Sequence, residues 1–338
     1  KDAAIPALLE LIEDNEDEPL ILKQAARSLG LIGTDKAAAA LSMLLKDNDS
    51  LVRETTARSM GAIASKKIMD VLVKALKDPS WRVRKAAADS LHKLKWQPQD
   101  DAEKAFFMVA DQDWSGLIKL GNPALVPLKL TLNDQAGWVR RSAVETISSI
   151  KKPDEKVLLR ILDEKSPKLK AAAARALGRI RCYKAEDKLI KLLDDPDQEV
   201  RLAAVGSLGV LRSTKAVPVL KRLMKSPNRN FRGKVVTALA LSRDDSVVAD
   251  LAVIAEKDHW EVRRRAIAGL SRFPGPVAEK ALVAALDDDD FFNRKLAAGA
   301  LKTRRWQPST TYEKCLFNIA DGNWDAVVDL GPDAHSSL

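Results

Sequence analysis

The chain has 338 residues, of which 46% are hydrophobic, 5% aromatic and 30% charged, and its formal net charge is +9 at pH 7. This composition is too apolar for a disordered chain, and no run approaches the roughly 18 apolar residues of a membrane span, so we expect an ordered, cytoplasmic protein. Two cysteines far apart and three histidines imply neither a disulfide framework nor a zinc site.

A motif of Val-Arg, small residues and then Leu-Gly or a related pair recurs along the chain, for example from Val200-Arg201 to Leu208-Gly209. We name the arginine position the basic slot. Slots fall at residues 22, 53, 84, 140, 170, 201, 232, 263 and 294, so successive slots are 30 or 31 residues apart except for one step of 56. A unit of about 31 residues is too short to bury a core of its own, and the repetition therefore predicts nine stacked units.

Each unit is predicted to contain two helices. Apolar residues 12, 9 and 8 positions before the slot, such as Leu189, Leu192 and Leu193, have the spacing of one helix face. A pair such as Asp195-Pro196 follows and favours the start of a second helix. The second helix contains the slot and, in several units, a glycine eight positions after it, which allows close contact between helices.

The long step holds 25 extra residues between the third and fourth units. The segment 96–121 begins Trp-Gln-Pro, and its apolar pattern predicts two short helices that end at a glycine. The same pattern returns 210 positions later, after the ninth unit, in the segment 306–331. We predict that both segments are inserted two-helix modules of one solenoid spanning residues 1–338, and we expect the chain to be truncated after the second.

Tryptophans at matching positions are the candidate contact residues of the two modules. They either pack the module onto its neighbours or form a protruding contact site. These residues are Trp96, Trp114, Trp306 and Trp324.

The two-helix unit, with Asp-Pro in the turn and Val-Arg in the second helix, resembles the HEAT repeat, in the short prokaryotic variety known as phycobilin-lyase-like. The resemblance extends over essentially the whole chain. It implies an all-α fold, a right-handed α-solenoid (α-α superhelix) of about nine HEAT-like helix pairs, in which the second helices line the concave surface. The modules resemble an insertion found in uncharacterised prokaryotic HEAT-repeat proteins.

An acidic residue stands six positions before six of the nine slots. Such an acid can cap the second helix and lie near the slot arginines, which predicts a structural ladder of charges along the stack. The six acids are Asp47, Asp78, Asp134, Glu164, Asp195 and Asp288.

The candidate binding residues stand one and five positions after the slot. Eight basic residues occupy these positions, against only three acids, Glu54, Asp89 and Glu145, so positive charges are in excess by five. Because the resemblance places these positions on the concave surface, it implies a mildly basic groove, although an ordinary solvated helix face would have the same composition. The eight are Lys23, Arg27, Arg58, Lys85, Arg141, Arg175, Arg264 and Lys295.

No catalytic, cofactor-binding or metal-binding residues are predicted, because the three histidines are scattered and no phosphate loop or calcium loop is present. We interpret the protein as a non-enzymatic protein–protein interaction scaffold whose partner is an acidic protein and not a membrane. One alternative is nucleic-acid binding through the basic groove. The other, which the lyase resemblance implies, is an accessory role in cofactor attachment. Aromatic residues for base stacking are missing from the candidate positions.

Overall fold

The structure is a computed structural model that describes residues 2–331. Helices connected by turns make up this part of the chain, and no strand occurs within it. The chain divides into two compact units, Lys1–Ala176 and Leu177–Leu338, and the division falls within helix α12. The expected truncation after residue 331 concerns residues 332–338, which lie outside the described part.

In the first unit, first and second helices alternate along the chain. The first helices are α1 (Ile5–Asp14), α3 (Asp35–Leu44), α5 (Lys66–Ala75), α9 (Leu125–Thr131) and α11 (Glu155–Ile161). The second helices are α2 (Pro19–Ile32), α4 (Ser50–Met60), α6 (Trp81–Lys93), α10 (Gly137–Ser149) and α12 (Pro167–Arg179). Two further helices, α7 (Asp101–Asp111) and α8 (Trp114–Leu120), lie between α6 and α9 in the sequence.

The second unit continues the alternation. Its first helices are α13 (Glu186–Lys191), α15 (Val217–Leu223), α17 (Val248–Lys257) and α19 (Pro276–Ala284). Its second helices are α14 (Gln198–Leu211), α16 (Arg229–Ser242), α18 (Trp260–Leu270) and α20 (Phe291–Thr303), and the helices α21 (Thr311–Asp321) and α22 (Trp324–Val328) follow. Short 3-10 turns η1 to η6 span Asp2–Ala4, Asn122–Ala124, Tyr183–Ala185, Leu192–Asp194, Asp245–Val247 and Ala285–Asp287.

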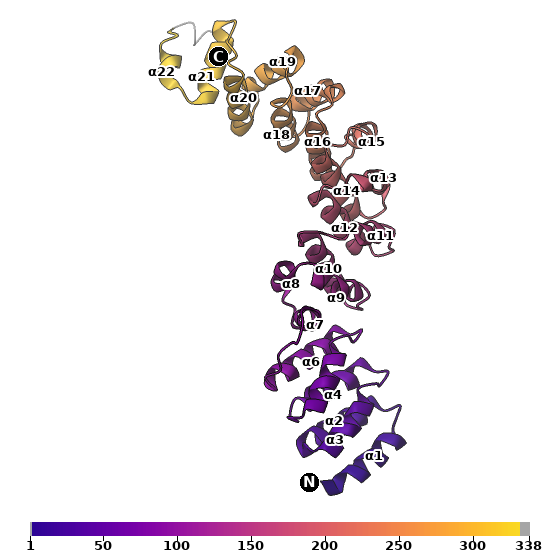
Figure 1. Cartoon of the computed structure of the whole chain (residues 1–338). Helices are drawn as coiled ribbons and strands as arrows, with labels where there is room; N and C mark the ends of the chain where they lie inside the picture. The colour runs from indigo at the N-terminus through magenta and orange to yellow at the C-terminus, as the bar shows by residue number, and fades with distance from the viewer. Residues whose placement is uncertain (1, 332–338) are drawn as a thin grey trace. The chain divides into compact units, whose positions relative to one another are not determined.

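Consecutive second helices pack directly against one another within each unit. Helix α4 contacts α2 and α6, and helix α16 contacts α14 and α18 (Figure 1). Glycines eight positions after the slot make this approach possible, because a Cβ atom at Gly30 would lie 2.8 Å from the Cβ of Ser59. A Cβ at Gly178 would likewise lie 2.6 Å from the Cβ of Ser207. The predicted close contact at these glycines is confirmed.

The core runs between the first and second helices of each repeat. Leu41 and Leu72, on first helices, are fully buried. Met60, Leu91 and Leu270, seven positions after their slots on second helices, are also fully buried. Since no repeat encloses these side chains alone, each is covered in part by the next helix pair. The fold is therefore the all-α solenoid of helix pairs that the repeat period predicts.

The segment 96–121 contains α7 and α8. Helix α7 packs against α6 and α9, and α8 packs against α10. Gly121, with φ of 78°, ends α8 in a conformation that favours glycine. The ring of Phe107 on α7 contacts both Trp96 and His92, with centroids 5.6 and 4.8 Å apart. His92 occupies the position where other units have glycine, so an aromatic contact to α7 takes the place of a close helix contact there.

Candidate binding surface

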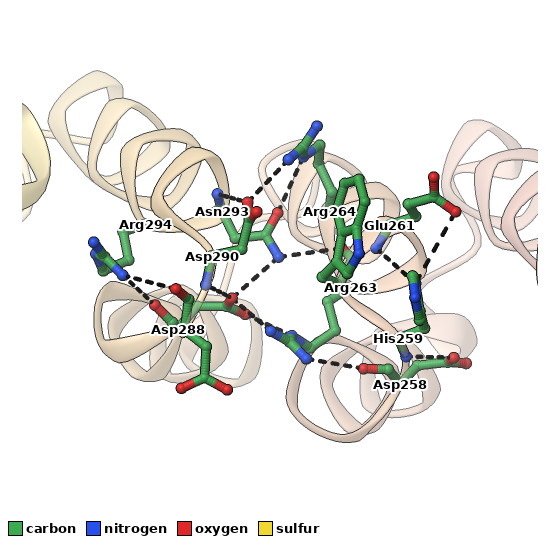
Figure 2. Close-up of polar contacts among 11 residues, drawn as sticks. Asp258, His259, Glu261, Arg263, Arg264, Asp288, Asp290, Asn293 and Arg294 are labelled. Atoms are coloured by element: carbon green, nitrogen blue, oxygen red, sulfur yellow. Dashed lines mark hydrogen bonds and ion pairs between the residues drawn. The ribbon is translucent and has the colours of Figure 1, made fainter.

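The slot arginines join consecutive repeats in pairs. The Arg263 guanidinium donates from Nε to Oδ2 and from Nη2 to Oδ1 of Asp288, both at 2.7 Å (Figure 2). The Arg53 guanidinium binds Asp78 in the same bidentate way, with Nε and Nη2 at 2.8 and 3.0 Å from the two carboxylate oxygens. We call such a bidentate link two-pronged and a link through one nitrogen single-pronged. Arg232 also donates from Nε and Nη2 to the Asp258 carboxylate. The predicted ladder is confirmed at these repeats, where each of the three arginines binds an acid in the turn of the following repeat.

The third nitrogen of each slot arginine holds the turn of its own repeat. Nη1 of Arg294 donates to the carbonyl oxygens of Asp288 and Asp289 at 2.7 and 3.2 Å. The acid itself does not cap the second helix, which corrects our expectation: the N-cap of α20 is Asp290, and Asp288 instead accepts the Asp290 backbone N–H at 2.8 Å. The acid lies two residues too early to reach the free N–H groups of the first helical turn.

One link of the ladder crosses the segment 96–121. Nη2 of Arg84 donates to Oδ2 of Asp134 at 2.8 Å, although 50 residues separate the two. Their side chains are only 6% and 0% exposed. Nε of Arg84 is buried and has no hydrogen-bond partner within residues 2–331. The stack of repeats therefore continues past the extra residues, with a single-pronged link.

Two acids of the ladder, Asp258 and Asp288, have lowered pKa values. Burial raises the pKa of Asp288, but hydrogen bonds from Arg263 and from the Asp290 backbone outweigh burial, and the net pKa is lowered. Burial and the Arg232 hydrogen bond act in the same opposed way on Asp258, whose pKa is also lowered. Asp258 stands five rather than six positions before its slot, so the fixed spacing used on the sequence missed it.

All eight predicted binding residues lie on second helices and none is buried, but the structure distributes them over both units. Arg264 and Lys295 lie in the second unit and the other six in the first. Lys23, Arg141 and Lys295 form no ion pair or hydrogen bond through their side chains in the described part of the chain. Their charges are therefore available to a ligand.

Two of the remaining cations are held by neighbouring acids. Arg58 pairs with Glu54 at 2.8 Å on the same helix. Lys85 pairs with Asp89 at 2.7 Å and with Asp111 of α7 at 3.0 Å. The Lys85 ammonium thus ties α6 to the segment 96–121, a structural role that its position in the repeat did not reveal.

Arg264 is fixed in place by polar and aromatic contacts together. Its Nη2 donates to Asp290 at 2.9 Å and its Nε to Asn293 at 3.2 Å, so it bridges α18 and α20 (Figure 2). The guanidinium also lies over the rings of Trp260 and Phe292, 4.9 and 5.1 Å from their centroids. Arg264 is a preorganised cation between two exposed rings.

Exposed aromatic residues stand at the first turns of second helices, where the sequence patterns did not predict them. Trp138 and Trp260 are each 39% exposed, and Phe291 and Phe292 are 51% and 61% exposed. All four stand two or three positions before a slot, whereas the candidate positions lie one and five after it. The sequence did contain a signal for these exposed rings. Bulky aromatic residues recur two or three positions before a slot, at the start of a second helix, outside the positions that form the core.

A groove opens beside second helices in each unit. The groove between α2 and α4 has a volume of about 380 Å³ and is lined by Arg27, Gly30, Leu31, Thr55, Arg58, Ser59 and Ala62. The groove between α18 and α20 has a volume of about 500 Å³ and is lined by Ser271, Phe292, Lys295, Leu296, Gly299, Ala300, Thr303 and Arg304. Predicted binding residues line both.

The candidate tryptophans of the two segments are not equivalent in the structure. Trp96 and Trp306 are half-buried and contact Phe107 and Phe317, with ring centroids 5.6 and 5.8 Å apart. Trp114 is also half-buried, whereas Trp324 is 62% exposed. Packing accounts for the first two, and Trp324 is the one open to contact.

Residues 2–331 contain no group of three or more His, Cys, Asp or Glu side chains that could hold a metal ion. Among the same residues, none of the helices combines the length and the apolarity needed to cross a membrane.

Comparison with known proteins defines the class. The family model of HEAT repeats matches residues 1–60, 42–118, 155–232 and 220–302, and the chain therefore belongs to the HEAT-repeat family. No curated protein sequence matches it.

The solved structures that are similar to the chain include the following two. The X-ray structure of YibA from Escherichia coli has 22% sequence identity and a TM-score of 0.45, over 79% of this chain and 92% of that one. The complex of CpcE and CpcF of phycocyanin lyase from Nostoc sp. PCC7120 has 20% identity and a TM-score of 0.43, over 63% of this chain and 94% of that one.

Proposed function

We propose that the protein is a non-enzymatic scaffold that binds an acidic region of a partner protein on the second-helix surfaces of its two units. The observation that supports this proposal is that some cations of the second helices are paired within the protein and others are not. Slot arginines such as Arg53 and Arg263 are bound to acids of the ladder. Lys23, Arg141 and Lys295 lie on second helices, are not buried, and form no side-chain ion pair or hydrogen bond among residues 2–331.

Electrostatic complementarity gives such a surface its selectivity. Unpaired cations on a protein surface attract an acidic partner and raise its association rate. Exposed pairs such as Arg58 with Glu54 add little stability to the fold, so their arginines can exchange a partner within the protein for one on a ligand at small cost.

The two described histidines have structural surroundings that support a non-enzymatic role. The His92 ring packs edge-on against Phe107. The Nδ1 of His259 accepts the backbone N–H of Glu261 at 3.4 Å at the start of α18. Each histidine therefore has a packing or capping role, and neither needs a catalytic one to explain its position.

Charge reversal at the three unpaired cations tests the proposal. The triple variant Lys23→Glu, Arg141→Glu and Lys295→Glu should bind a labelled poly-glutamate peptide at least about tenfold more weakly than the unmodified protein, because several surface charge contacts become repulsive. The matched control reverses three exposed lysines on first helices, Lys36, Lys67 and Lys280, two in the first unit and one in the second.

The control variant has the same net charge as the triple variant, so it should change poly-glutamate binding less than about twofold if position rather than total charge matters. Equal losses in the two variants would contradict a specific second-helix surface. A DNA duplex titrated in parallel decides the class of partner. Sub-micromolar DNA binding near physiological salt, lost only in the triple variant, would show that the surface serves nucleic acid instead.

A further inference from the structure

The groove between α18 and α20 combines an apolar floor with an unfilled space. Leu296 and Ala300 form its floor, and Phe292, 61% exposed, forms one end. Gly299 lies between them, and a Cβ atom added there would meet no other atom within 4 Å. The glycine thus leaves room over the helix for a side chain that comes from elsewhere.

The charges around this groove are of one sign. Its eight lining residues include two cations, Lys295 and Arg304, and no acid. Nη2 of Arg304 donates to the carbonyl oxygen of Leu270 at 2.8 Å, which fixes that guanidinium at the end of α18. The nearby acid Asp290 is already neutralised by Arg264. An apolar groove with a basic rim therefore faces the solvent.

The end of the groove at Phe292 is preorganised for binding. Arg264 is held between Trp260 and Phe292 and hydrogen-bonded to Asp290 and Asn293, so little side-chain freedom remains to be lost when a ligand binds. The rings of Trp260 and Phe292 offer flat apolar faces, held in place by the paired Arg264 guanidinium between them.

The length of the groove limits the size of its occupant. From Phe292 to Thr303, α20 rises about 16 Å at about 1.5 Å per residue, which is the length of about five residues of extended chain. A short segment fits this length, whereas a folded protein face would need a wider surface.

We propose that the groove between α18 and α20 docks a short acidic segment of a partner protein, whose one aromatic or aliphatic side chain enters the space above Gly299 while its carboxylates meet Lys295 and Arg304. This inference rests on the proposed function and names the part of the surface that selects the partner. The groove between α2 and α4 is a poorer anchor, because the aliphatic Leu31 stands there without an aromatic ring and Arg58 is already paired.

Filling the groove from within tests the inference. In Gly299→Leu the new side chain occupies the open space, and leucine favours the helix more than glycine does, so α20 should stay folded. Gly206→Leu is the matched control, because Gly206 also stands five positions after a slot on a second helix of the same unit and also has no atom within 4 Å of an added Cβ. No residue of the groove is altered by the control.

The probe is a phage-displayed library of random short peptides selected on the unmodified protein. We expect enrichment of peptides with several acids and one aromatic or aliphatic residue. These peptides should bind Gly206→Leu as they bind the unmodified protein, and Gly299→Leu at least about tenfold more weakly, because the anchor is excluded. Absence of enrichment, enrichment of basic peptides, or equal binding to both variants would overturn the inference.

A double variant outside the groove separates this inference from the proposed function. Lys23→Glu with Arg141→Glu changes the first unit only. One outcome would contradict the groove and still support the charged surface. In it, the double variant weakens poly-glutamate binding, whereas Gly299→Leu changes neither poly-glutamate binding nor binding of the selected peptides. Selected peptides lost only in Gly299→Leu would establish the groove and confine binding to it.

Discussion

Two links of the arginine ladder join equivalent positions of neighbouring repeats in different ways. Arg263 reaches both oxygens of Asp288 with two nitrogens, 25 residues along the chain. Arg84 reaches Asp134 with one nitrogen, 50 residues along the chain, and its Nε is buried without a partner in the described residues. The segment 96–121 lies in the sequence between Arg84 and Asp134, whereas no such segment lies between Arg263 and Asp288.

This comparison shows which contacts the 25 extra residues of the long step leave intact. The acid of each link lies in the turn before a second helix, so extra residues placed before the next first helix leave that turn intact. The repeats then stay in register, and the cost is confined to one hydrogen bond of Arg84. The link between Arg84 and Asp134 is thus kept although 50 residues separate the two.

Removing the acid of the single-pronged link should have the largest effect. Asp134→Ala leaves the Arg84 charge buried and unpaired, which we expect to lower the free energy of unfolding by about 3 to 5 kcal/mol. Urea unfolding followed by circular dichroism measures this change. Asp17→Ala, at an exposed position, is the control and should stay within about 0.5 kcal/mol. A loss below about 1 kcal/mol in Asp134→Ala would mean that water reaches Arg84 and that the two links differ little.

Removing the acid of the two-pronged link should cost less, although it breaks more hydrogen bonds. Asp288→Ala should lower the free energy of unfolding by about 1.5 to 3 kcal/mol, because the Arg263 side chain is 15% exposed and can regain water. The same urea titration ranks the two variants. If Asp288→Ala proved more destabilising than Asp134→Ala, the number of hydrogen bonds, and not burial, would govern the strength of a link.

The tryptophans of the segments 96–121 and 306–331 extend the comparison to packing. Trp96→Ala should lower the free energy of unfolding by about 2 kcal/mol, since the ring is half-buried against Phe107 and complete burial is worth about 3 to 5 kcal/mol. Trp324→Ala should change it by less than about 0.5 kcal/mol, because that ring is mostly exposed. Thermal melting measures both. An unchanged melting temperature for Trp96→Ala, combined with loss of peptide binding, would favour a contact role for the first segment.

The repeat period was sufficient to predict the fold, and the ladder followed from acids at a fixed spacing, because both depend on local sequence alone. The partner of each arginine could not be predicted, since the spacing repeats along the chain and fits the acid of its own turn as well as the next. Asp258 was missed because its turn is one residue shorter. The groove above Gly299 and the stacking of Arg264 depend on contacts between α18 and α20, which no single repeat encodes.

Acid should weaken the links of Arg232 to Asp258 and of Arg263 to Asp288 in a predictable direction. The pKa values of Asp258 and Asp288 are lowered in the folded protein, so between these values and the ordinary aspartate pKa of about 3.9 the unfolded chain binds more protons. Their contribution to stability is therefore complete above about pH 4 and is lost as the pH falls through the folded-state values. Protonation should destabilise the protein less than removal of Asp134, Asp288 or the Trp96 ring does, because a protonated carboxyl keeps its shape and can still accept a hydrogen bond.

Urea unfolding measured from pH 7 down to pH 3 tests this dependence. In Asp288→Asn the free energy of unfolding should be lower than in the unmodified protein at pH 7 and should fall less steeply below pH 4, because one titrating partner of the ladder is gone. The control Asp289→Asn changes a neighbouring carboxylate that accepts no hydrogen bond within residues 2–331 and should keep the original slope. Equal slopes in all three proteins would show that Asp288 is not a source of acid sensitivity, and the Arg263 link would then owe its strength to hydrogen-bond geometry rather than to charge.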